Sequence, residues 1–459
     1  MDYMDFIASK RHSSIDAGIE PRYIPDFLFD FQRYAVEYSV RKGRCAVFFD
    51  TGLGKTLIEL VNARNYFEHT GKPTLIITPL AVAFQFVDEC ERFGIGSIEY
   101  SRNGKHSSEI VVCNYERISK FKPSDFGCVI LDESSILKNF EGAIKAQVTE
   151  FLKKVAYRFL FTATPSPNDF VELGTSSEAL GYMGYTDMLG AFFTNNEDTI
   201  KPQNIGTKWL LKGHATDSFF EWVSSWSISM RKPSDLGFDD TRFVLPDLKL
   251  NRHIVQNEDP LVIGGQTALF NYVAKSMKEI QAETRATVEK RCEKGAELAM
   301  ARDISVMWCN RNDESDMLKR LTDAVELKGT MPIDKKEEIL IGFSKGEFKR
   351  LITKPTITAF GLNWQHCDHT VFFPTFSYEQ YYQAIRRFWR FGQTKPVTVD
   401  LVLSDGQTRV LDSLVAKTEK ANRLFDKLNV SLHSQFNSRI ATFNEETVFP
   451  SFLNGEHNG

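Results

Sequence analysis

The sequence contains neither a long apolar run nor paired cysteines. None of its apolar stretches approaches the ~20 residues that a membrane-spanning helix requires. The seven cysteines are scattered, and no two of them form a C-x-x-C pair. A disulfide framework and a zinc ribbon are therefore not expected, and a reducing compartment suits the chain. Repeats of a fixed short period and low-complexity segments are also missing, which argues against fibrous and solenoid proteins.

The sequence also has little net charge. Its 56 Lys and Arg residues and 60 Asp and Glu residues give a formal charge of -4. A surface that binds nucleic acid must therefore be local, because the chain as a whole does not attract phosphate. With 42% hydrophobic and 25% charged residues, the composition is that of a soluble globular protein, and the length corresponds to about three domains. Asp2 and Asp5 lie in an N-terminus without an apolar run, so we expect no secretory signal or anchor and a cytoplasmic location.

Short apolar runs alternate with amphipathic stretches in two series. The predicted strands are 45–49, 74–77, 110–113, 128–131 and 157–162 in the first series, and 304–309, 350–352, 370–373 and 397–403 in the second. Each run is too short for a helix and largely apolar throughout, as in strands buried on both faces of a parallel sheet. Helical patterns such as 314–325 and 335–343 separate the later strands. The alternation predicts an α/β protein with two parallel sheets flanked by helices.

The region between the two series, roughly residues 168–310, is less regular. Its first part is rich in Gly, Thr and Asn, and residues 235–248 contain helix-breaking residues typical of a linker. Residues 266–301 form a charged helical pattern. We therefore expect a first domain at 1–245 with an insertion from about 168, a linker and helical region at 246–304, a second domain at 305–445 and a flexible tail at 446–459.

Residues 47–56, VFFDTGLGKT, join a predicted strand to a predicted helix through a loop that contains glycine. Gly52 and Gly54 allow backbone N–H groups to surround phosphate oxygens, and the N-terminus of the helix adds positive potential. Lys55 can reach the β- and γ-phosphates, and the Thr56 hydroxyl can bind Mg²⁺. The general phosphate-loop pattern has a further glycine where this chain has phenylalanine, and a plain strand–turn–helix corner is the alternative. We predict that a nucleoside triphosphate is bound by Thr51, Gly52, Leu53, Gly54, Lys55 and Thr56.

Two adjacent carboxylates, Asp132 and Glu133, follow the predicted strand 128–131. They should emerge at the carboxyl edge of the sheet, where nucleotide clefts lie in open α/β folds. Asp132 would hold Mg²⁺, usually through water, and Glu133 would orient and polarise the attacking water. A solvated strand end is the more common fate of an isolated Asp-Glu pair. Downstream of a phosphate loop, the catalytic interpretation is favoured.

Residues 377–393, SYEQYYQAIRRFWRFGQ, are predicted to form one helix with two distinct faces. On a helical wheel Gln383, Arg387 and Arg390 fall together, and the aromatic residues lie opposite. A charge run on a helix is usually a solvated face. Arginines that reach a γ-phosphate across a cleft are, however, what the first domain lacks for hydrolysis. We therefore expect Arg387 and Arg390 to be catalytic.

Eight short motifs, in their order along the chain, resemble those of superfamily 2 helicases and translocases. They are FQ (31–32), DTGLGKT (50–56), ITPL (77–80), NYE (114–116), DESS (132–135), TATPSPND (162–169), GLN (361–363) and QAIRRFWRFGQ (383–393). GLGKT, GLN and the double-arginine motif are most similar to the Swi/Snf-like branch. The short chain and GLNWQHC look like compact DEAD/DEAH-type proteins of phage genomes. The resemblance covers roughly residues 27–175 and 305–405 and implies two RecA-like domains with ATP bound between them.

The resemblance also implies roles for residues that match the family motifs. It implies that Gln32 reads the adenine edge and that one nucleic-acid strand is faced by Thr78, Pro79 and Asn114. Gly361 and Asn363 would lie at the cleft between the domains and, with Gln383, contact the nucleotide. Nucleotide state would be coupled to domain closure by Thr162, Ala163, Thr164 and Pro165. The chain departs from the family at Arg386, where an acidic residue or His is frequent, and in the segment ITKPTITAF before Gly361.

Two further segments leave alternatives open. Residues 365–369, QHCDH, contain two His, a Cys and an Asp and could suggest a metal site. Tetrahedral zinc normally takes its ligands from two spaced pairs, and no matching pair stands out elsewhere. Residues 278–299 could be a nucleic-acid wedge or a partner helix, but their mixed charges favour a solvated helix.

The combined motifs predict a nucleic-acid-dependent ATPase that uses ATP and Mg²⁺ and moves along DNA, duplex or branched. Thr56 and Asp132 would hold the metal ion. One alternative is a strand-separating helicase on single-stranded DNA, forks or RNA, with a separation module hidden in residues 168–304. The other is an ATP-gated scaffold that loads a partner, whose signature would be loss of Glu133 or of both arginines. We expect a monomer, with or without protein partners, in the bacterial cytoplasm or in that of the host if a phage encodes it.

Overall fold

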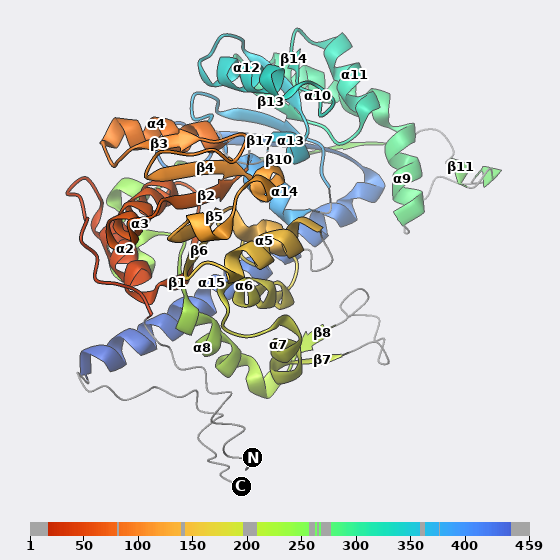
Figure 1. The fold of residues 1–459 in the computed structure, drawn as a ribbon. Coiled ribbons are helices and arrows are strands. Elements are labelled where there is room, and N and C mark those ends of the chain that lie inside the picture. The colour runs from red at the N-terminus through yellow and green to blue at the C-terminus, as the bar shows by residue number, and fades with distance from the viewer. Residues whose placement is uncertain are drawn as a thin grey trace. The chain divides into compact units, whose positions relative to one another are not determined.

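The protein is described by a computed structural model that covers residues 17–79, 82–138, 143–195, 209–256, 262–263, 266–267, 277–358, 363–375 and 377–441. The chain forms two compact units. The first comprises Met1–Arg242 and Ala421–Gly459, and the second comprises Phe243–Lys420. Each unit contains its own parallel sheet, and the elements are labelled in Figure 1. No helix among the described residues is both long and apolar enough to cross a membrane.

The first unit is built on a seven-stranded parallel sheet with the order β3-β4-β2-β5-β6-β1-β9. Its strands are β1 (Arg44–Phe49), β2 (Thr74–Thr78), β3 (Ile98–Tyr100), β4 (Ile110–Asn114), β5 (Cys128–Asp132), β6 (Tyr157–Phe161) and β9 (Ser227–Met230). The five strands predicted for the first series are confirmed, and β3 and β9 are additional. The sequence of β9, SISM, alternates serine with apolar residues and so lacks the continuous apolar run that identified the others.

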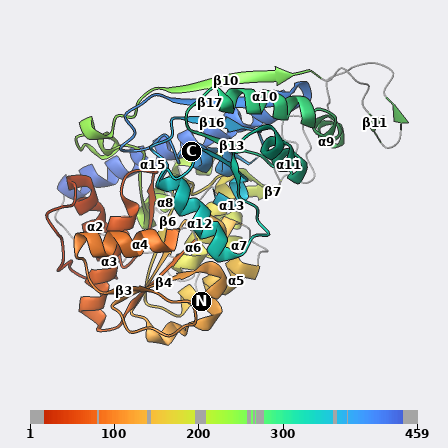
Figure 2. The same ribbon diagram turned by 90° about the horizontal axis from the view of Figure 1, so that it is seen from above.

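Helices cover both faces of this sheet. They are α2 (Asp30–Lys42), α3 (Lys55–Thr70), α4 (Ala83–Phe93), α5 (Ala143–Lys153), α6 (Leu173–Leu180), α7 (Tyr185–Phe192) and α8 (Thr216–Trp226). In Figure 2, α2, α3 and α4 lie on one side of the strands and α5, α6 and α7 on the other. A short antiparallel hairpin, β7 (Phe193–Asn195) with β8 (Trp209–Leu211), follows α7.

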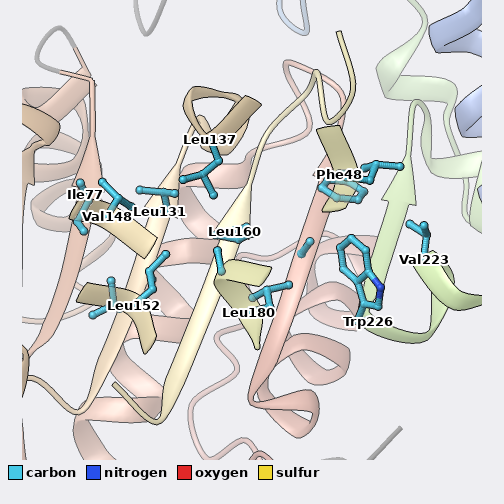
Figure 3. Packing of buried hydrophobic residues seen from close by; sticks show 14 of the residues in the cluster. Phe48, Ile77, Leu131, Leu137, Val148, Leu152, Leu160, Leu180, Val223 and Trp226 are labelled. Atoms are coloured by element: carbon cyan, nitrogen blue, oxygen red, sulfur yellow. The ribbon is translucent and has the colours of Figure 1, made fainter. Parts of the chain in front are cut away.

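Alternate side chains of the strands form the core on one face of the sheet. Figure 3 shows Phe48, Ile77, Leu131 and Leu160 directed towards side chains of α5, α6 and α8 such as Trp226. Ile77 pairs with Leu131 and Leu131 pairs with Leu160, so the three side chains share one face of the sheet. Phe48 lies two residues after the partner of Leu160 and therefore points to the same face. These four strand residues and Trp226 are fully buried. Burial of a side chain of this size stabilises the fold by roughly 1.5–3 kcal/mol, and the core fixes the strand ends that carry the polar residues described below.

The second unit contains a six-stranded parallel sheet with the order β10-β17-β16-β13-β15-β14. Its strands are β10 (Leu248–Val255), β13 (Ser305–Trp308), β14 (Val325–Glu326), β15 (Arg350–Thr353), β16 (His369–Phe372) and β17 (Val397–Ser404). Its helices are α9 (Met277–Ala286), α10 (Val288–Met300), α11 (Asn312–Leu321), α12 (Ile333–Ser344), α13 (Pro355–Thr358) and α14 (Tyr378–Ile385). A two-stranded pair, β11 (Val262–Ile263) with β12 (Gln266–Thr267), precedes α9. The four predicted strands of the second series and both predicted helices are present, but α11 ends at Leu321 and Val325, predicted to be helical, begins β14.

The region expected to be a linker, 246–304, contributes to the second unit instead. β10 is an edge strand paired with β17, and most of its side chains are exposed, which explains why its sequence lacks a strand pattern. α10 packs into a core cluster through Cys292, Ala296 and Ala299. Arg291 on the same helix is fully buried, and its Nη1 lies 2.8 Å from Oε1 of buried Glu314. The interpretation of this stretch as a solvated helix therefore holds for one face, where Glu289 and Glu293 are exposed, whereas the opposite face is buried and includes an ion pair.

The last helix, α15 (Thr408–Ala441), begins in the second unit, and its residues from Ala421 onward belong to the first. Leu424, Phe425 and Leu428 lie in the core cluster of the first unit. The Ser229 hydroxyl on β9 donates a hydrogen bond of 2.9 Å to Oδ1 of Asn429. The division of the chain thus differs from the expected second domain at 305–445, because the end of α15 packs on the first sheet.

Candidate active site

Four adjacent strands of the first sheet, β2, β5, β6 and β1, end next to polar residues. Because all strands of the sheet are parallel, their carboxyl ends meet at one edge. β1 leads into the glycine loop at 50–54, β2 ends at Thr78 and β5 ends at Asp132. Thr162 directly follows β6. The strand order therefore brings the predicted phosphate loop, the carboxylate pair and the motif at 162–165 to the same edge.

The phosphate loop has the backbone that its glycines permit. Gly52 and Gly54 have φ angles of 85° and 73°, in the left-handed region that glycine adopts without steric penalty. Gly54 is the N-cap of α3, and the first turn of α3 contains no acidic side chain and no side-chain cap. Its positive end is therefore suited to an anion. The Lys55 ammonium donates hydrogen bonds of 3.0 and 3.2 Å to the carbonyl oxygens of Phe49 and Asp50.

Gln32 on α2 is attached to this loop. It is buried, its Nε2 donates to the carbonyl oxygen of Leu53 at 3.0 Å, and its Oε1 accepts from the backbone N–H of Phe29 at 3.0 Å. A Cβ atom on residue 54 would collide with Nε2 of Gln32, so a side chain at this position would displace the Gln32 amide. Gln32 is thus hydrogen-bonded to the phosphate loop through Leu53. The recognition of adenine by Gln32 stays a prediction.

Asp132 lies between Thr78 and Glu133. Burial, followed by the charge of Glu133, raises the pKa of Asp132 to about 7. The Thr78 hydroxyl opposes this shift by donating a hydrogen bond of 2.8 Å to Oδ2 of Asp132. Thr78 is fully buried and its hydroxyl contacts this carboxylate, and its expected role in facing a nucleic-acid strand stays a prediction.

The other two residues expected to face nucleic acid differ from each other in exposure. Pro79 is half-buried. The Asn114 side chain is buried, and its amide donates a hydrogen bond of 2.6 Å to Oε2 of Glu116. The roles of Pro79 and Asn114 stay predictions.

Glu133 is the only non-glycine residue of the described chain with a positive φ angle, 51°. This conformation costs roughly 1–2 kcal/mol for a residue with a Cβ atom. Thr162 donates a hydrogen bond of 3.3 Å to Oε2 of Glu133, and the Thr164 backbone N–H donates to the Thr162 hydroxyl at 3.1 Å. Ala163 and Pro165 are buried beside them. The motif expected to couple nucleotide state to closure is thus hydrogen-bonded to Glu133, and the coupling itself stays a prediction.

A third carboxyl group at this edge, that of Glu59 on α3, is not predicted from the sequence. It is fully buried, and neither of its oxygens has a hydrogen-bond partner among the described residues. Burial and then the charge of Asp132 raise the pKa of Glu59 well above its ordinary value, and Lys55 opposes the shift. Its position one helical turn after Lys55 could have revealed it. A cation at this edge would relieve the repulsion among the carboxyls, and the Thr56 hydroxyl and Asp132 carboxylate are oxygen ligands that Mg²⁺ accepts.

The predicted helix at 377–393 is interrupted. α14 ends at Ile385, and Arg387 and Arg390 lie in the turns that follow. After the end of the helix, the carbonyl oxygen of Arg387 accepts a hydrogen bond of 3.0 Å from the backbone N–H of Trp364. The Gln393 amide then donates to the carbonyl oxygen of Gln365 at 3.0 Å. The prediction of one continuous helical face was therefore wrong.

The arginines of this segment have different surroundings. Arg387 is buried, whereas the Arg386 guanidinium lies over the rings of Tyr382 and Trp389, 5.2 and 4.5 Å from their centroids. Gln383 is buried, and its Nε2 lacks a hydrogen-bond partner in the part of the chain that the structure describes. Asn363 is exposed, and Gly361 lies outside the described residues.

The QHCDH segment is explained by a buried polar bridge between strands. His369 is fully buried, and its two ring nitrogens lie 2.8 Å from the Ser305 hydroxyl and 2.8 Å from Oδ2 of Asp400. The other oxygen of Asp400 lies 2.9 Å from Nε2 of His253 and accepts a hydrogen bond of 2.8 Å from Asn251. Within the described ranges, no group of three His, Cys, Asp or Glu side chains could hold a metal ion.

Two protein-family models match the chain. Residues 29–173 match the DEAD/DEAH box helicase family, and residues 297–392 match the helicase conserved C-terminal domain. Together the two matches cover just over half of the sequence.

Two known proteins illustrate the similarity in sequence. The SWI/SNF-related matrix-associated actin-dependent regulator of chromatin subfamily A-like protein 1 of Xenopus tropicalis is 28% identical over 179 residues, which are 37% of this chain and 18% of that protein. The DNA annealing helicase and endonuclease ZRANB3 of Mus musculus is 27% identical over 180 residues, 34% of this chain and 17% of that protein. The chain thus matches less than a fifth of the length of either relative.

A solved structure, the Sulfolobus solfataricus SWI2/SNF2 ATPase core in complex with dsDNA, is similar with a TM-score of 0.41 and 16% identity, covering 94% of this chain and 99% of that one. At such a TM-score, the fold class follows from the two parallel sheets and not from the superposition. One family match lies within each of the two units that contain these sheets, and one of the two relatives is named as SWI/SNF-related. The chain therefore belongs to the superfamily 2 helicases and translocases, is similar in sequence to members of their Swi/Snf-like branch, and its two units are RecA-like domains.

Proposed function

We propose that this protein is an ATP-driven motor that moves along duplex or branched DNA. The observation that carries the proposal is the single sheet edge that holds the phosphate loop, Asp132 and Glu133. The buried hydrogen bonds from Thr78 to Asp132 and from Thr162 to Glu133 give each carboxylate a defined position. Such preorganisation is what hydrolysis of a triphosphate requires, since the protein contributes mainly positioning and electrostatic stabilisation.

The residues at this edge divide the chemistry among them. On binding of ATP, Lys55 would exchange its two carbonyl partners for oxygens of the β- and γ-phosphates. Asp132 and Thr56 would hold Mg²⁺, which neutralises charge on the phosphates. Glu133 would accept a proton from the attacking water, and its hydrogen bond from Thr162 keeps the carboxylate directed. Arg387 and Arg390 would stabilise the transferred phosphoryl group from the second RecA-like domain.

Duplex or branched DNA is proposed as the track because both curated relatives have names that refer to chromatin or DNA. The carboxylate Glu133 and both arginines are present, so the signature of an ATP-gated scaffold without hydrolysis is missing from the sequence. Binding to DNA would depend on a local surface, because the formal net charge is -4.

The proposal is tested by the steady-state ATPase rate with duplex DNA, single-stranded DNA, forked DNA and RNA, compared in one preparation. We expect duplex or forked DNA to stimulate the rate most, and Lys55→Ala to abolish it. Triplex displacement and fork unwinding by the same preparation separate the two motor types. Strong fork unwinding without triplex displacement would favour the strand-separating helicase, and absence of DNA stimulation would contradict the motor.

A further inference from the structure

Tyr115 connects two strand ends that are not neighbours in the sheet. It begins the short 3-10 helix η2 (Tyr115–Lys120), directly after β4. The strand order places β2 between β4 and β5, so the side chain of Tyr115 reaches past the end of β2 to the end of β5. There its hydroxyl donates to the main-chain carbonyl oxygen of Asp132 and lies 3.2 Å from that of Glu133. The hydrolysis proposed above assigns no role to this residue.

The two carbonyl groups belong to the two peptide units that flank the Cα atom of Glu133. Their relative orientation is set by the φ and ψ angles of Glu133, and its φ of 51° is unfavourable for a residue with a Cβ atom. Such a conformation persists only where surrounding contacts hold it. The Tyr115 hydroxyl touches both peptide units, and the carbonyl oxygen of Glu133 also accepts a hydrogen bond of 3.3 Å from the backbone N–H of Ile136.

The backbone conformation at Glu133 decides where its carboxylate lies. A change of φ towards the ordinary negative range would swing the Cβ atom, and the carboxylate with it, away from the Thr162 hydroxyl that it contacts at 3.3 Å. Only 5% of Tyr115 is exposed, so water does not compete for its hydroxyl. Burial also raises the pKa of Tyr115 well above its ordinary value, which keeps the donated proton in place.

We propose that Tyr115 is a positioning residue for ATP hydrolysis, whose hydroxyl holds the left-handed backbone of Glu133 so that the carboxylate is placed to activate water. The inference rests on the proposed function, because it requires Glu133 to act on the attacking water. Thr162 would hold the carboxylate end of Glu133 and Tyr115 the backbone end. Tyr115 touches neither the nucleotide nor the water in this account.

The test compares Tyr115→Phe with a matched control, Tyr66→Phe. Tyr66 is a fully buried residue of the same unit, and its hydroxyl also donates to a main-chain carbonyl, that of Val40, at 2.7 Å. Both variants lose one buried hydroxyl, and thermal unfolding fixes an assay temperature at which both are folded. We expect Tyr115→Phe to lower kcat of the DNA-stimulated ATPase about 10- to 100-fold with KM nearly unchanged. Tyr66→Phe should keep kcat near that of the wild type.

A double-mutant cycle with Glu133→Gln identifies the route of the effect. Single-turnover hydrolysis is measured in the wild type, both single variants and the double variant. If Tyr115 acts through Glu133, Tyr115→Phe should slow the Glu133→Gln protein little further. An equal factor in both backgrounds, an unchanged kcat in Tyr115→Phe, or an equal loss in Tyr66→Phe would each overturn the inference. A wild-type protein without ATPase activity would instead contradict the proposed function.

Discussion

Thr78 and Asp132 are joined by a hydrogen bond of 2.8 Å from the threonine hydroxyl to Oδ2 of the carboxylate. The two residues end neighbouring strands, β2 and β5, so the bond is a consequence of the sheet order. It opposes burial and the charge of Glu133, which together raise the pKa of Asp132 to about 7. Near neutral pH the Asp132 carboxyl is therefore poised between its protonated and its ionised form.

The first prediction concerns the pH dependence of Mg²⁺-dependent nucleotide binding. A carboxylate must be ionised to bind a metal ion, so a raised pKa weakens binding below that pKa. We expect the affinity to rise between pH 6 and pH 8, with a slope that approaches about tenfold per pH unit on the acidic side.

Two variants of Thr78 test the origin of this profile. Thr78→Val should move the profile to higher pH, because it removes the hydrogen bond that lowers the pKa of Asp132, and Thr78→Ser should leave the profile in place. Equilibrium binding of a fluorescent ATP analogue measures the profile, and a profile that is flat in all three proteins would refute the assignment.

The second prediction separates the three arginines that follow α14. Arg387→Ala and Arg390→Ala should each lower kcat by on the order of 10³-fold or more, with little change in ATP affinity, as for arginine fingers. Arg386→Ala removes the cation–π contacts with Tyr382 and Trp389, which are worth about 0.5–1 kcal/mol of stability, and should lower kcat much less. Single-turnover kinetics and thermal unfolding of the three variants measure both effects. If Arg386→Ala were the most damaging to kcat, the assignment of the catalytic arginines would be wrong.

The third prediction concerns the buried pair Arg291–Glu314, which joins α10 to α11. Arg291→Met leaves the Glu314 carboxylate buried without its counter-charge, which should cost about 3–5 kcal/mol of unfolding free energy. Lys349→Met is the control, because Lys349 pairs with Asp303 at 2.6 Å on the exposed surface and should change stability little. Urea unfolding of both variants compares the two effects. Equal midpoints for Arg291→Met and the wild type would contradict a structural role for this pair.

The sequence predicts those parts of the fold that depend on local pattern. Continuous apolar runs identify nine strands, and the spacing of Gly52, Gly54 and Lys55 identifies the phosphate loop. β10 is missed because it is a largely exposed edge strand in which polar residues interrupt the apolar ones, so its sequence contains no continuous apolar run. The end of α14 is misplaced because no Gly or Pro marks it in the sequence: the helix ends at Ile385, and the backbone that follows makes a tertiary hydrogen bond from Trp364 to Arg387.

The contacts within the candidate site depend on the strand order, which a single sequence does not reveal. The motifs containing Thr78, Asp132 and Thr162 can be recognised separately, but the pairing of Thr78 with Asp132 requires β2 and β5 to be adjacent. The reach of Tyr115 past β2 depends on the same order. Glu59 is missed because an acidic residue on a helix is normally exposed, and only the packing shows that its side chain is buried.

The central claim is that the edge formed by β1, β2, β5 and β6 hydrolyses ATP, with Glu133 activating water. Glu133→Gln tests it most directly, because the variant keeps Asp132, Lys55 and the shape of the side chain. ATP binding and single-turnover hydrolysis are measured with DNA present in the variant and the wild type. The account predicts near-normal ATP affinity with hydrolysis slowed at least about 100-fold. Near-normal turnover by Glu133→Gln would contradict it.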